Sequence, residues 1–140
     1  MTIATTVAAL QALHATVTGV TKAPTVTPAS INTADLPMVI TIPGACTWSH
    51  EAVGLRKQVR EYIVRLFVGP VGQDTVDEAF DAAVPIIQAM GQAYIDNPTL
   101  TSAVTHIDQD FTDTGLDGQL LFAGNTYRGC EFRVRITEKW

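Results

Sequence analysis

Charged side chains are scarce in this chain of 140 residues, at 16% of the sequence, whereas globular domains average about 25%. The 14 acidic residues outnumber the 9 basic ones, so the formal net charge is −5 and the pI is about 4.9. Proteins that bind nucleic acid usually carry a basic patch and a basic balance, so the composition argues against specific nucleic-acid recognition. A surface with few charges must hold more apolar or neutral groups, which indicates contacts with other proteins.

The sequence also lacks the patterns that mark secretion, membrane insertion or a cysteine-based site. No basic segment precedes an apolar run at the N-terminus, and no run approaches the ~18 apolar residues of a membrane span. The two cysteines, Cys46 and Cys130, do not form a Cys-x-x-Cys motif. We expect no membrane segment and two reduced, buried thiols, with a disulfide as the alternative.

Two short segments contain the residue types of a metal site, and each lacks a ligand that the chemistry requires. His50-Glu51 begins like the helix motif of zinc proteases, but Gly54 stands where the second histidine is needed. The acidic segment that begins at Asp108 brings carboxylates close together, as calcium loops do. Its sixth position is Asp113 rather than glycine, and its twelfth is Gln119 rather than glutamate. We interpret both segments as loops and predict no metal ligands.

No nucleophile, phosphate loop or cofactor motif is recognisable elsewhere in the chain. The thiols have three histidines as candidate partners, His14, His50 and His106, and no spacing favours one pair. Cys130 falls on the predicted core face of a strand, where a thiol is usually inert. Gly69-Pro70-Val71-Gly72 reads as a turn between a strand and a helix. We predict no catalytic residue, no cofactor and no enzymatic activity. A small-molecule-binding or enzymatic α+β domain is the alternative from another class.

Residues 1–140 are expected to form a single domain that begins with a helix and an extended connector. The connector covers residues 15–36 and is rich in Thr, Pro, Ala and Ser. The helix covers residues 3–14, and Thr2 precedes it as a cap. Its apolar residues repeat at helical spacing: Ile3, Val7, Leu10 and Leu13.

The predicted core, residues 37–140, has four strand signals, at 38–42, 58–69, 119–122 and 127–138. The last two are predicted to form a hairpin, and the residues around 44–57 are expected to form a loop. The final strand alternates cleanly between an apolar and a polar face, with Cys130, Phe132, Val134 and Ile136 on one side and Glu131, Arg133, Arg135 and Thr137 on the other.

One more helix is predicted between the second and third strands. A capping box of Thr75 and Glu78 marks its start, Asn97-Pro98 marks its end, and Pro85 inside it predicts a kink or a restart. The order helix, strand, strand, helix, strand, strand predicts an α+β fold. We expect a mainly antiparallel β-sheet of about four strands with helices packed on one face.

The placement of charge is the most informative feature for function. Eight of the nine basic residues fall between Arg56 and Lys139, and the acidic residues cluster at 74–81 and 108–117. A solvated polar face is one interpretation. The other is that basic strands of one copy meet acidic segments of the next, which generates a ring or filament. The candidate subunit-interface residues are Arg60, Arg65, Arg133, Arg135, Asp77, Asp108 and Asp110.

From about residue 36 to the end, the chain resembles the tail terminator family of long-tailed bacteriophages, also described as minor tail proteins. Four stretches carry the resemblance, in this order and spacing. They are Leu36-Pro37-Met38-Val39-Ile40, the long strand from Arg60 to Val68, the helix end from Tyr94 to Leu100, and the final stretch from Gly124 to Ile136, where Tyr127-Arg128-Gly129 enters a strand.

The resemblance implies a structural virion protein at the head-proximal end of the phage tail, assembled in the host cytoplasm. It implies a homohexameric ring that caps the tail tube, stops its growth and joins the tail to the head-neck connector. The implied partners are therefore further copies of the chain, the tail tube protein and the connector protein. The resemblance brings no catalytic residues with it. Another tail or neck protein, a tail completion protein or a tube subunit, is the nearest alternative.

Overall fold

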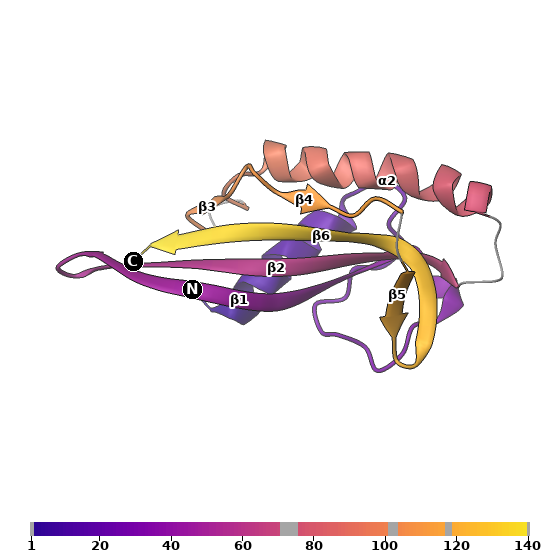
Figure 1. Ribbon diagram of the computed structural model, residues 1–140, viewed down its shortest axis with the longest axis horizontal. Helices are drawn as coiled ribbons and strands as arrows, with labels where there is room; N and C mark the ends of the chain where they lie inside the picture. Colours follow the sequence, from indigo (N-terminus) through magenta and orange to yellow (C-terminus); the bar gives the residue numbers. More distant parts are fainter. Residues whose placement is uncertain (1, 71–75, 101–103, 117–118, 140) are drawn as a thin grey trace.

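The structure is a computed structural model that describes residues 2–70, 76–100, 104–116 and 119–139, apart from the side chains of 76–80. It is elongated, with α2 along one long side and the β1–β2 hairpin projecting at one end (Figure 1). The elements follow in the order α1 (Ile3–Ala15), η1 (Thr33–Asp35), β1 (Met38–Ala52), β2 (Leu55–Pro70), α2 (Val76–Asp96), β3 (His106–Ile107), β4 (Thr112–Asp113), β5 (Gln119–Phe122) and β6 (Asn125–Lys139).

The strands form one antiparallel sheet in the order β1-β2-β6-β3, and β4 and β5 also pair with β6. Strand β2 lies in the centre, pairing with β6 from Lys57 opposite Lys139 to Pro70 opposite Tyr127. Neighbouring side chains of a strand point to opposite faces, so the register assigns every residue of β2 and β6 to one face. The α+β class and the antiparallel sheet predicted from the sequence are confirmed.

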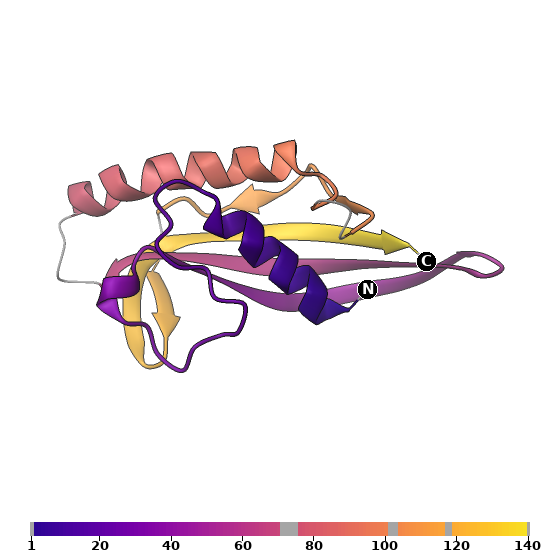
Figure 2. The same cartoon turned by 180° about the vertical axis from the view of Figure 1, so that it is seen from behind.

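The main core lies between the sheet and the two helices. Apolar residues from β2 and β6 meet Leu10 of α1 and Tyr94 of α2, and all are almost fully buried. Figure 2 shows α1 lying obliquely across the strands, while α2 runs along the side of the sheet nearer to β6. This burial supplies most of the apolar stabilisation and joins the two helices to the sheet. Its central residues are Val39, Tyr62, Val64, Leu66, Ala83, Met90, Phe132, Val134 and Ile136.

A second, smaller apolar cluster lies on the other face of the sheet, at the end away from the projecting hairpin. It consists of Met38, Ile40, Phe67 and Tyr127. The connector covers it from one side and β5 from the other, through the partly buried residues Ile31, Leu36, Leu120 and Phe122. The first part of the connector, with Val17, Val20 and Ala23, packs in the main core, and its later part, with Ile31 and Leu36, packs on the opposite sheet face.

Several local predictions are confirmed. Thr2 caps α1 through a hydrogen bond from the Thr5 amide to its side chain, at 3.1 Å. The β5–β6 hairpin forms around a short turn at Ala123 and Gly124. In β6 the predicted apolar face is buried, but Thr137, assigned to the polar face, is buried as well.

The prediction of about four strands is too low, since the described residues form a sheet of six strands. The two further strands, β3 and β4, contain two residues each and lie in the acidic stretch that was expected to be irregular. Their pairing partners in β6 lie 19 to 31 positions later in the chain, so no local pattern marks these strands. Strands this short depend on their neighbours for their conformation.

Two other expectations are corrected. Residues 44–57 are not a loop, because β1 continues to Ala52 and β2 already starts at Leu55. The helix α2 does not restart at Pro85, because it is continuous from Val76 to Asp96. Pro85 is exposed, so water can reach the carbonyl that loses its hydrogen bond there. The predicted capping residues Thr75 and Glu78 lie outside the described side chains.

Candidate interaction surfaces

Two of the predicted interface arginines form a chain of ion pairs on the sheet face opposite the helices. Arg65 of β2 stands opposite Glu131 of β6, and its Nε lies 3.2 Å from Glu131 Oε1. Arg133 follows two residues along β6, with its Nε 3.3 Å from Glu131 Oε2 and its Nη1 3.0 Å from Glu61 Oε1. Glu131 therefore bridges the two arginines. Its side chain is only 14% exposed.

Arg135 continues this surface with a carboxylate from the acidic stretch. Its Nη2 lies 3.0 Å from Asp108 Oδ2. A hydrogen bond from the Asp110 amide and the guanidinium of Arg135 lower the pKa of Asp108. We refer to this surface as the charge ladder: Arg65, Arg133 and Arg135 with Glu61, Glu131 and Asp108. Its three cations and three anions balance within one chain, so it attracts a charged partner only weakly. Exposed pairs of this kind contribute about 0–1 kcal/mol each to stability.

The remaining predicted interface residues do not join the charge ladder. Arg60 lies on the helix-side face of β2, where its Nη1 donates a hydrogen bond to the Gly44 carbonyl at 2.9 Å. Its Nε is buried and has no hydrogen-bond partner among the described residues. Asp110 is exposed beside Asp108. The side chain of Asp77 lies outside the described part of the chain.

The surface that the sequence did not predict is the end of the β1–β2 hairpin. Pairing between β2 and β6 stops at Lys57 and Lys139, whereas β1 and β2 pair up to Ala52 and Leu55. Residues 49–57, which we call the arm, are therefore a two-stranded ribbon beyond the body of the protein (Figure 1). The signal for it in the sequence is the Val53-Gly54 pair, since Gly54 adopts a φ of +77° in the two-residue turn.

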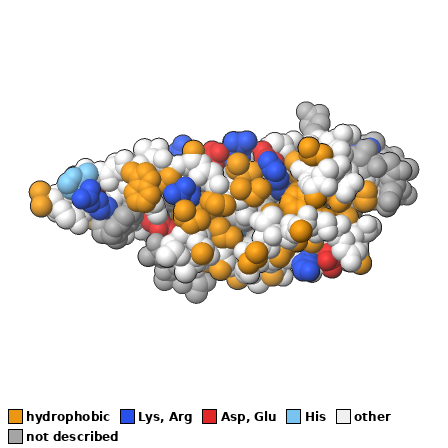
Figure 3. Space-filling view, turned by 90° about the horizontal axis from the view of Figure 1, so that it is seen from below, with side chains coloured by type: hydrophobic (Ala, Val, Ile, Leu, Met, Phe, Trp, Pro, Cys, Tyr) orange, Lys and Arg blue, Asp and Glu red, His pale blue; other side chains and the backbone are white. Residues whose placement is uncertain are grey.

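The arm combines apolar and basic side chains. Val53 at its tip is fully exposed and Leu55 is 36% exposed. Figure 3 shows hydrophobic and basic side chains side by side along this narrow end of the molecule. Glu51 pairs with both Lys57, at 3.5 Å, and Lys139, at 3.4 Å. Desolvation raises the pKa of Glu51, but the two ammonium groups outweigh this effect and lower it.

Arg56 adds a further positive charge to the arm. It is exposed and has no ion-pair partner among the residues that the structure describes. Within residues 49–57, Arg56 and Lys57 stand against one carboxylate, Glu51, so the arm carries an excess of one positive charge. The protein as a whole has a net charge of −5, which makes the arm an electrostatic exception.

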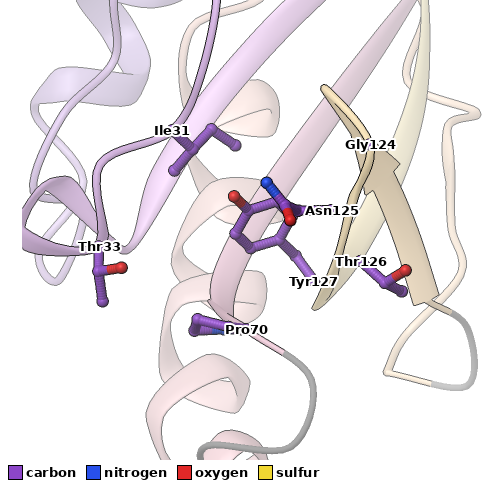
Figure 4. Close-up of a pocket in the computed structure, with 7 residues that line it drawn as sticks. All are labelled: Ile31, Thr33, Pro70, Gly124, Asn125, Thr126 and Tyr127. Carbon is purple, nitrogen blue, oxygen red and sulfur yellow. The ribbon is translucent and has the colours of Figure 1, made fainter.

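A cavity of about 540 Å³ lies at the opposite end of the molecule. Ile31 and Thr33 of the connector form one side, and Asn125 and Thr126 at the start of β6 form the other (Figure 4). Its apolar walls are Ile31 and two residues at the end of the sheet, Pro70 and Tyr127. Its lining surface is mainly polar, unlike the mostly apolar lining that is typical of small-molecule sites.

Both cysteines are free thiols in this structure. Cys130 is buried as expected, and burial raises the pKa of its thiol. Cys46 is only half-buried, because it follows the bulge in β1 and lies near the base of the arm.

Within the described ranges, no three His, Cys, Asp or Glu side chains converge in a way that fits a metal ion. His50 and Glu51 lie on the arm, and His106 starts β3. Among the described helices, none is long and apolar enough to cross a membrane.

Compared with known proteins, the chain matches no family model and no curated sequence. The candidate interaction surfaces of the described residues are the charge ladder, the arm and the end cavity.

Proposed function

We propose that this protein is a structural subunit that caps the tail tube of a long-tailed bacteriophage as a hexameric ring, a tail terminator. The resemblance rests on stretches that coincide with element boundaries. Leu36-Pro37 leads into β1, and Tyr127-Arg128-Gly129 lies where β6 leaves the β5 hairpin and joins β2. The α+β class with an antiparallel sheet agrees with the fold that the family resemblance implies.

The observation that carries the proposal is the difference between the two ends of the molecule. One end is a narrow arm with exposed apolar residues and excess positive charge. The other end holds a cavity whose lining residues are all uncharged. Contacts between unlike surfaces of identical subunits are heterologous, and they close into rings or continue as filaments. A tail terminator has to form a closed ring to which no further ring is added, whereas a tube subunit has to form rings that stack on one another.

In this proposal the sheet and two helices supply a rigid body, and the ends supply the contacts. Subunits with a net charge of −5 repel one another at long range, which favours a soluble pool before assembly. A completed ring then covers the last tube ring and offers its other side to the head-neck connector. No step in this sequence calls for a catalytic group, so we propose an assembly role in place of an enzymatic one.

Light scattering after size exclusion, combined with electron microscopy of the same fractions, tests the proposal. We expect a particle of six 15.0 kDa chains that appears as a closed ring. When tail tube protein is added, we expect rings at one end of each tube and no further elongation. Long tubes formed by this chain alone would favour the tube-subunit alternative. A monomer that ignores tubes would contradict any terminator function.

A further inference from the structure

The two long edges of the sheet differ in the described part of the chain. The outer edge of β6 is covered along most of its length, because β3, β4 and β5 all pair with it. Strand β1 forms the opposite edge, and among the described strands it pairs with β2 alone (Figure 1). The connector covers the start of this edge, where the Val39 amide donates to the Lys22 carbonyl at 3.0 Å. The rest of β1 is an edge to which another strand can be added.

The pairing of β2 shows which residues of β1 turn their backbone groups outward. Successive residues of an antiparallel strand bond alternately to the neighbours on its two sides. Val39 bonds outward, so Leu66 opposite it turns away from β1. Every second residue of β2 from there to Arg56 does the same, since the register of β2 with β6 is regular over this stretch. The residues of β1 that stand opposite them beyond the bulge, and therefore turn their amide and carbonyl groups outward, are Cys46, Trp48 and His50.

This stretch of β1 lacks the charges that normally protect an edge strand. Two bulges bound it, one between Pro43 and Cys46 and one between His50 and Ala52, so residues 46–50 are its regular part. They include no Lys, Arg, Asp, Glu or Pro, the residues that usually keep edge strands from pairing. The central residue, Trp48, is 63% exposed, and tryptophan is enriched in protein interfaces. An edge of this composition indicates pairing with a strand of another chain.

The arm lacks the support that strands normally need. Among the described residues, 49–56 pair within the ribbon alone, because β6 reaches no farther than Lys57. An isolated two-stranded hairpin is at best marginally stable in water, and a third strand or a packed face is usually required. A strand added to β1 along residues 46–52 would lie beside the arm and supply that third strand.

We propose that β1 pairs with β1 of a second copy, antiparallel and about a two-fold axis at Trp48. In this register Cys46 stands opposite His50, and Thr47 stands opposite Ser49. The two Trp48 side chains meet across the axis as a cross-strand aromatic pair, a contact that stabilises sheets. The outward backbone groups bond to one another, because Cys46, Trp48 and His50 all pair with residues of the same set.

The occupant is a second copy because this edge is complementary to itself. Glu51 is the one charged residue of β1, and it stands opposite Ala45 of the second copy, so like charges do not meet. Residues 49–52 of each copy lie beside residues 44–47 of the other, so a single contact supports both arms. The contact is isologous and closes at two copies. It is therefore separate from the head-to-tail contact of the proposed ring and goes beyond that proposal.

Disulfide trapping between separate chains tests the register. In a Cys46→Ser background, one preparation carries Thr47→Cys and a second carries Ser49→Cys. Both positions are exposed. Opposite residues that are not bonded through the backbone lie about 4.5 Å apart between Cα atoms, which a disulfide can span. After mixing and mild oxidation, we expect a dimer that contains one chain of each kind, and no dimer from either preparation alone.

Thr112→Cys is the matched control for Thr47→Cys. Thr112 is exposed on β4, at the opposite edge of the sheet. Mixed with Ser49→Cys under the same conditions, it should give no dimer. Equal cross-linking at Thr47 and Thr112 would show that the thiols meet by random collision and would overturn the proposed register.

A second measurement keeps the test independent of cysteine chemistry. His50→Pro removes an outward amide donor and leaves the bonds between β1 and β2 in place, because proline is tolerated where the amide faces away from the sheet. It should raise the dissociation constant of the dimer roughly tenfold or more, since the two-fold axis removes each hydrogen bond twice. His50→Ala is the matched control, which keeps the amide and should dimerise as the unmodified chain does. Light scattering over a range of concentrations measures both variants, and thermal unfolding checks that both fold. Equal dimerisation of the two variants contradicts pairing through the backbone.

The outcomes separate the strand pairing from the proposed ring. A single ring of six chains without the Thr47–Ser49 cross-link overturns the pairing and leaves the terminator proposal standing. Cross-linked dimers that form no rings on tail tubes support the pairing and contradict the terminator proposal. Pairs of rings joined by the cross-link support both, and chains that stay monomeric at all concentrations contradict both.

Discussion

His14 of α1 and Tyr94 of α2 share a hydrogen bond inside the core, with 2.6 Å between Nε2 and the phenol oxygen. Both side chains are fully buried. The hydrogen bonds of Gln11 determine whether Nε2 of His14 or the hydroxyl of Tyr94 is the donor. Its Nε2 donates to the carbonyls of Pro24 and Val39, so its Oε1 is the acceptor for Thr41 and for Nδ1 of His14. The proton of the neutral imidazole is therefore on Nδ1, and Nε2 accepts from Tyr94.

Tyr94→Phe should lower the free energy of unfolding by about 1–3 kcal/mol, because it leaves Nε2 of His14 buried without a donor. His14→Leu should also destabilise the protein, since it leaves the Tyr94 hydroxyl unpaired. The double substitution should cost less than the two single ones together, because no unpaired group of this pair remains. Urea unfolding of the four proteins measures this coupling. Strict additivity would show that the hydrogen bond contributes nothing beyond packing.

The same histidine should make stability depend on pH. Complete burial lowers the pKa of His14 from 6.5 to about 3. Between these values the unfolded chain binds a proton that the folded chain does not, so the free energy of unfolding falls as the pH drops. The expected slope is about 1.4 kcal/mol per pH unit between pH 6.5 and pH 3, with no contribution above pH 6.5.

Urea unfolding between pH 7 and pH 4 measures this slope, with His14→Gln as the control that lacks the titrating group. The carboxylates of the chain contribute equally to both proteins. The difference between the slopes of the two proteins therefore isolates the contribution of His14. Parallel pH profiles would contradict a neutral, buried imidazole in the folded state.

Local patterns predicted the elements that local chemistry determines. The alternation around Phe132 and Val134 indicated a half-buried strand, and the packing of β6 on the helices confirmed it. Thr2 at the start of an apolar repeat predicted the cap of α1. In both cases the evidence lies within one turn or one strand, so neighbouring residues suffice to reveal it.

Features that depend on register were not predictable from the sequence. Arg65 and Glu131 are 66 positions apart, and only the pairing of β2 with β6 brings them within 3.2 Å. Three of the four arginines assigned to an interface, Arg65, Arg133 and Arg135, are for this reason paired with carboxylates of the same chain, which the order of charges along the sequence does not reveal. The arm was missed because Ser49 to Ala52 show no alternation of apolar and polar residues, and the turn consists of Val53 and Gly54 alone.

A glycine in the final strand should be irreplaceable for steric reasons. The register between β2 and β6 shifts by one residue at Val68, opposite Gly129. A Cβ on Gly129 would collide with the Leu66 carbonyl oxygen, a backbone atom that cannot rotate away. Gly129→Ala should lower the free energy of unfolding by about 1–3 kcal/mol or abolish folding, because a packed sheet has to shift.

Gly91→Ala is the matched control for this prediction. Gly91 lies inside α2, and a Cβ there would contact the Phe111 ring at an ordinary 3.7 Å. Alanine in a helix interior should raise the free energy of unfolding by about 0.5–1 kcal/mol. Thermal and urea unfolding of both variants measure the opposite signs. A neutral Gly129→Ala would mean that β2 and β6 are farther apart at the bulge than described.

Salt should distinguish the arm from the charge ladder as a source of attraction between subunits. Arg133 is paired with Glu61 and Glu131 of its own chain, so Arg133→Gln should change assembly little. Arg56 has no such partner in the described part of the chain, so Arg56→Gln should weaken assembly several-fold at about 0.1 M salt. At about 1 M salt the Debye length falls from roughly 10 Å to 3 Å, and the difference between the two variants should disappear. Light scattering over a range of protein concentrations measures each midpoint. If Arg133→Gln weakens assembly as much as Arg56→Gln at low salt, the charge ladder takes part in the subunit contact and the ion pairs within the chain must open when the ring forms.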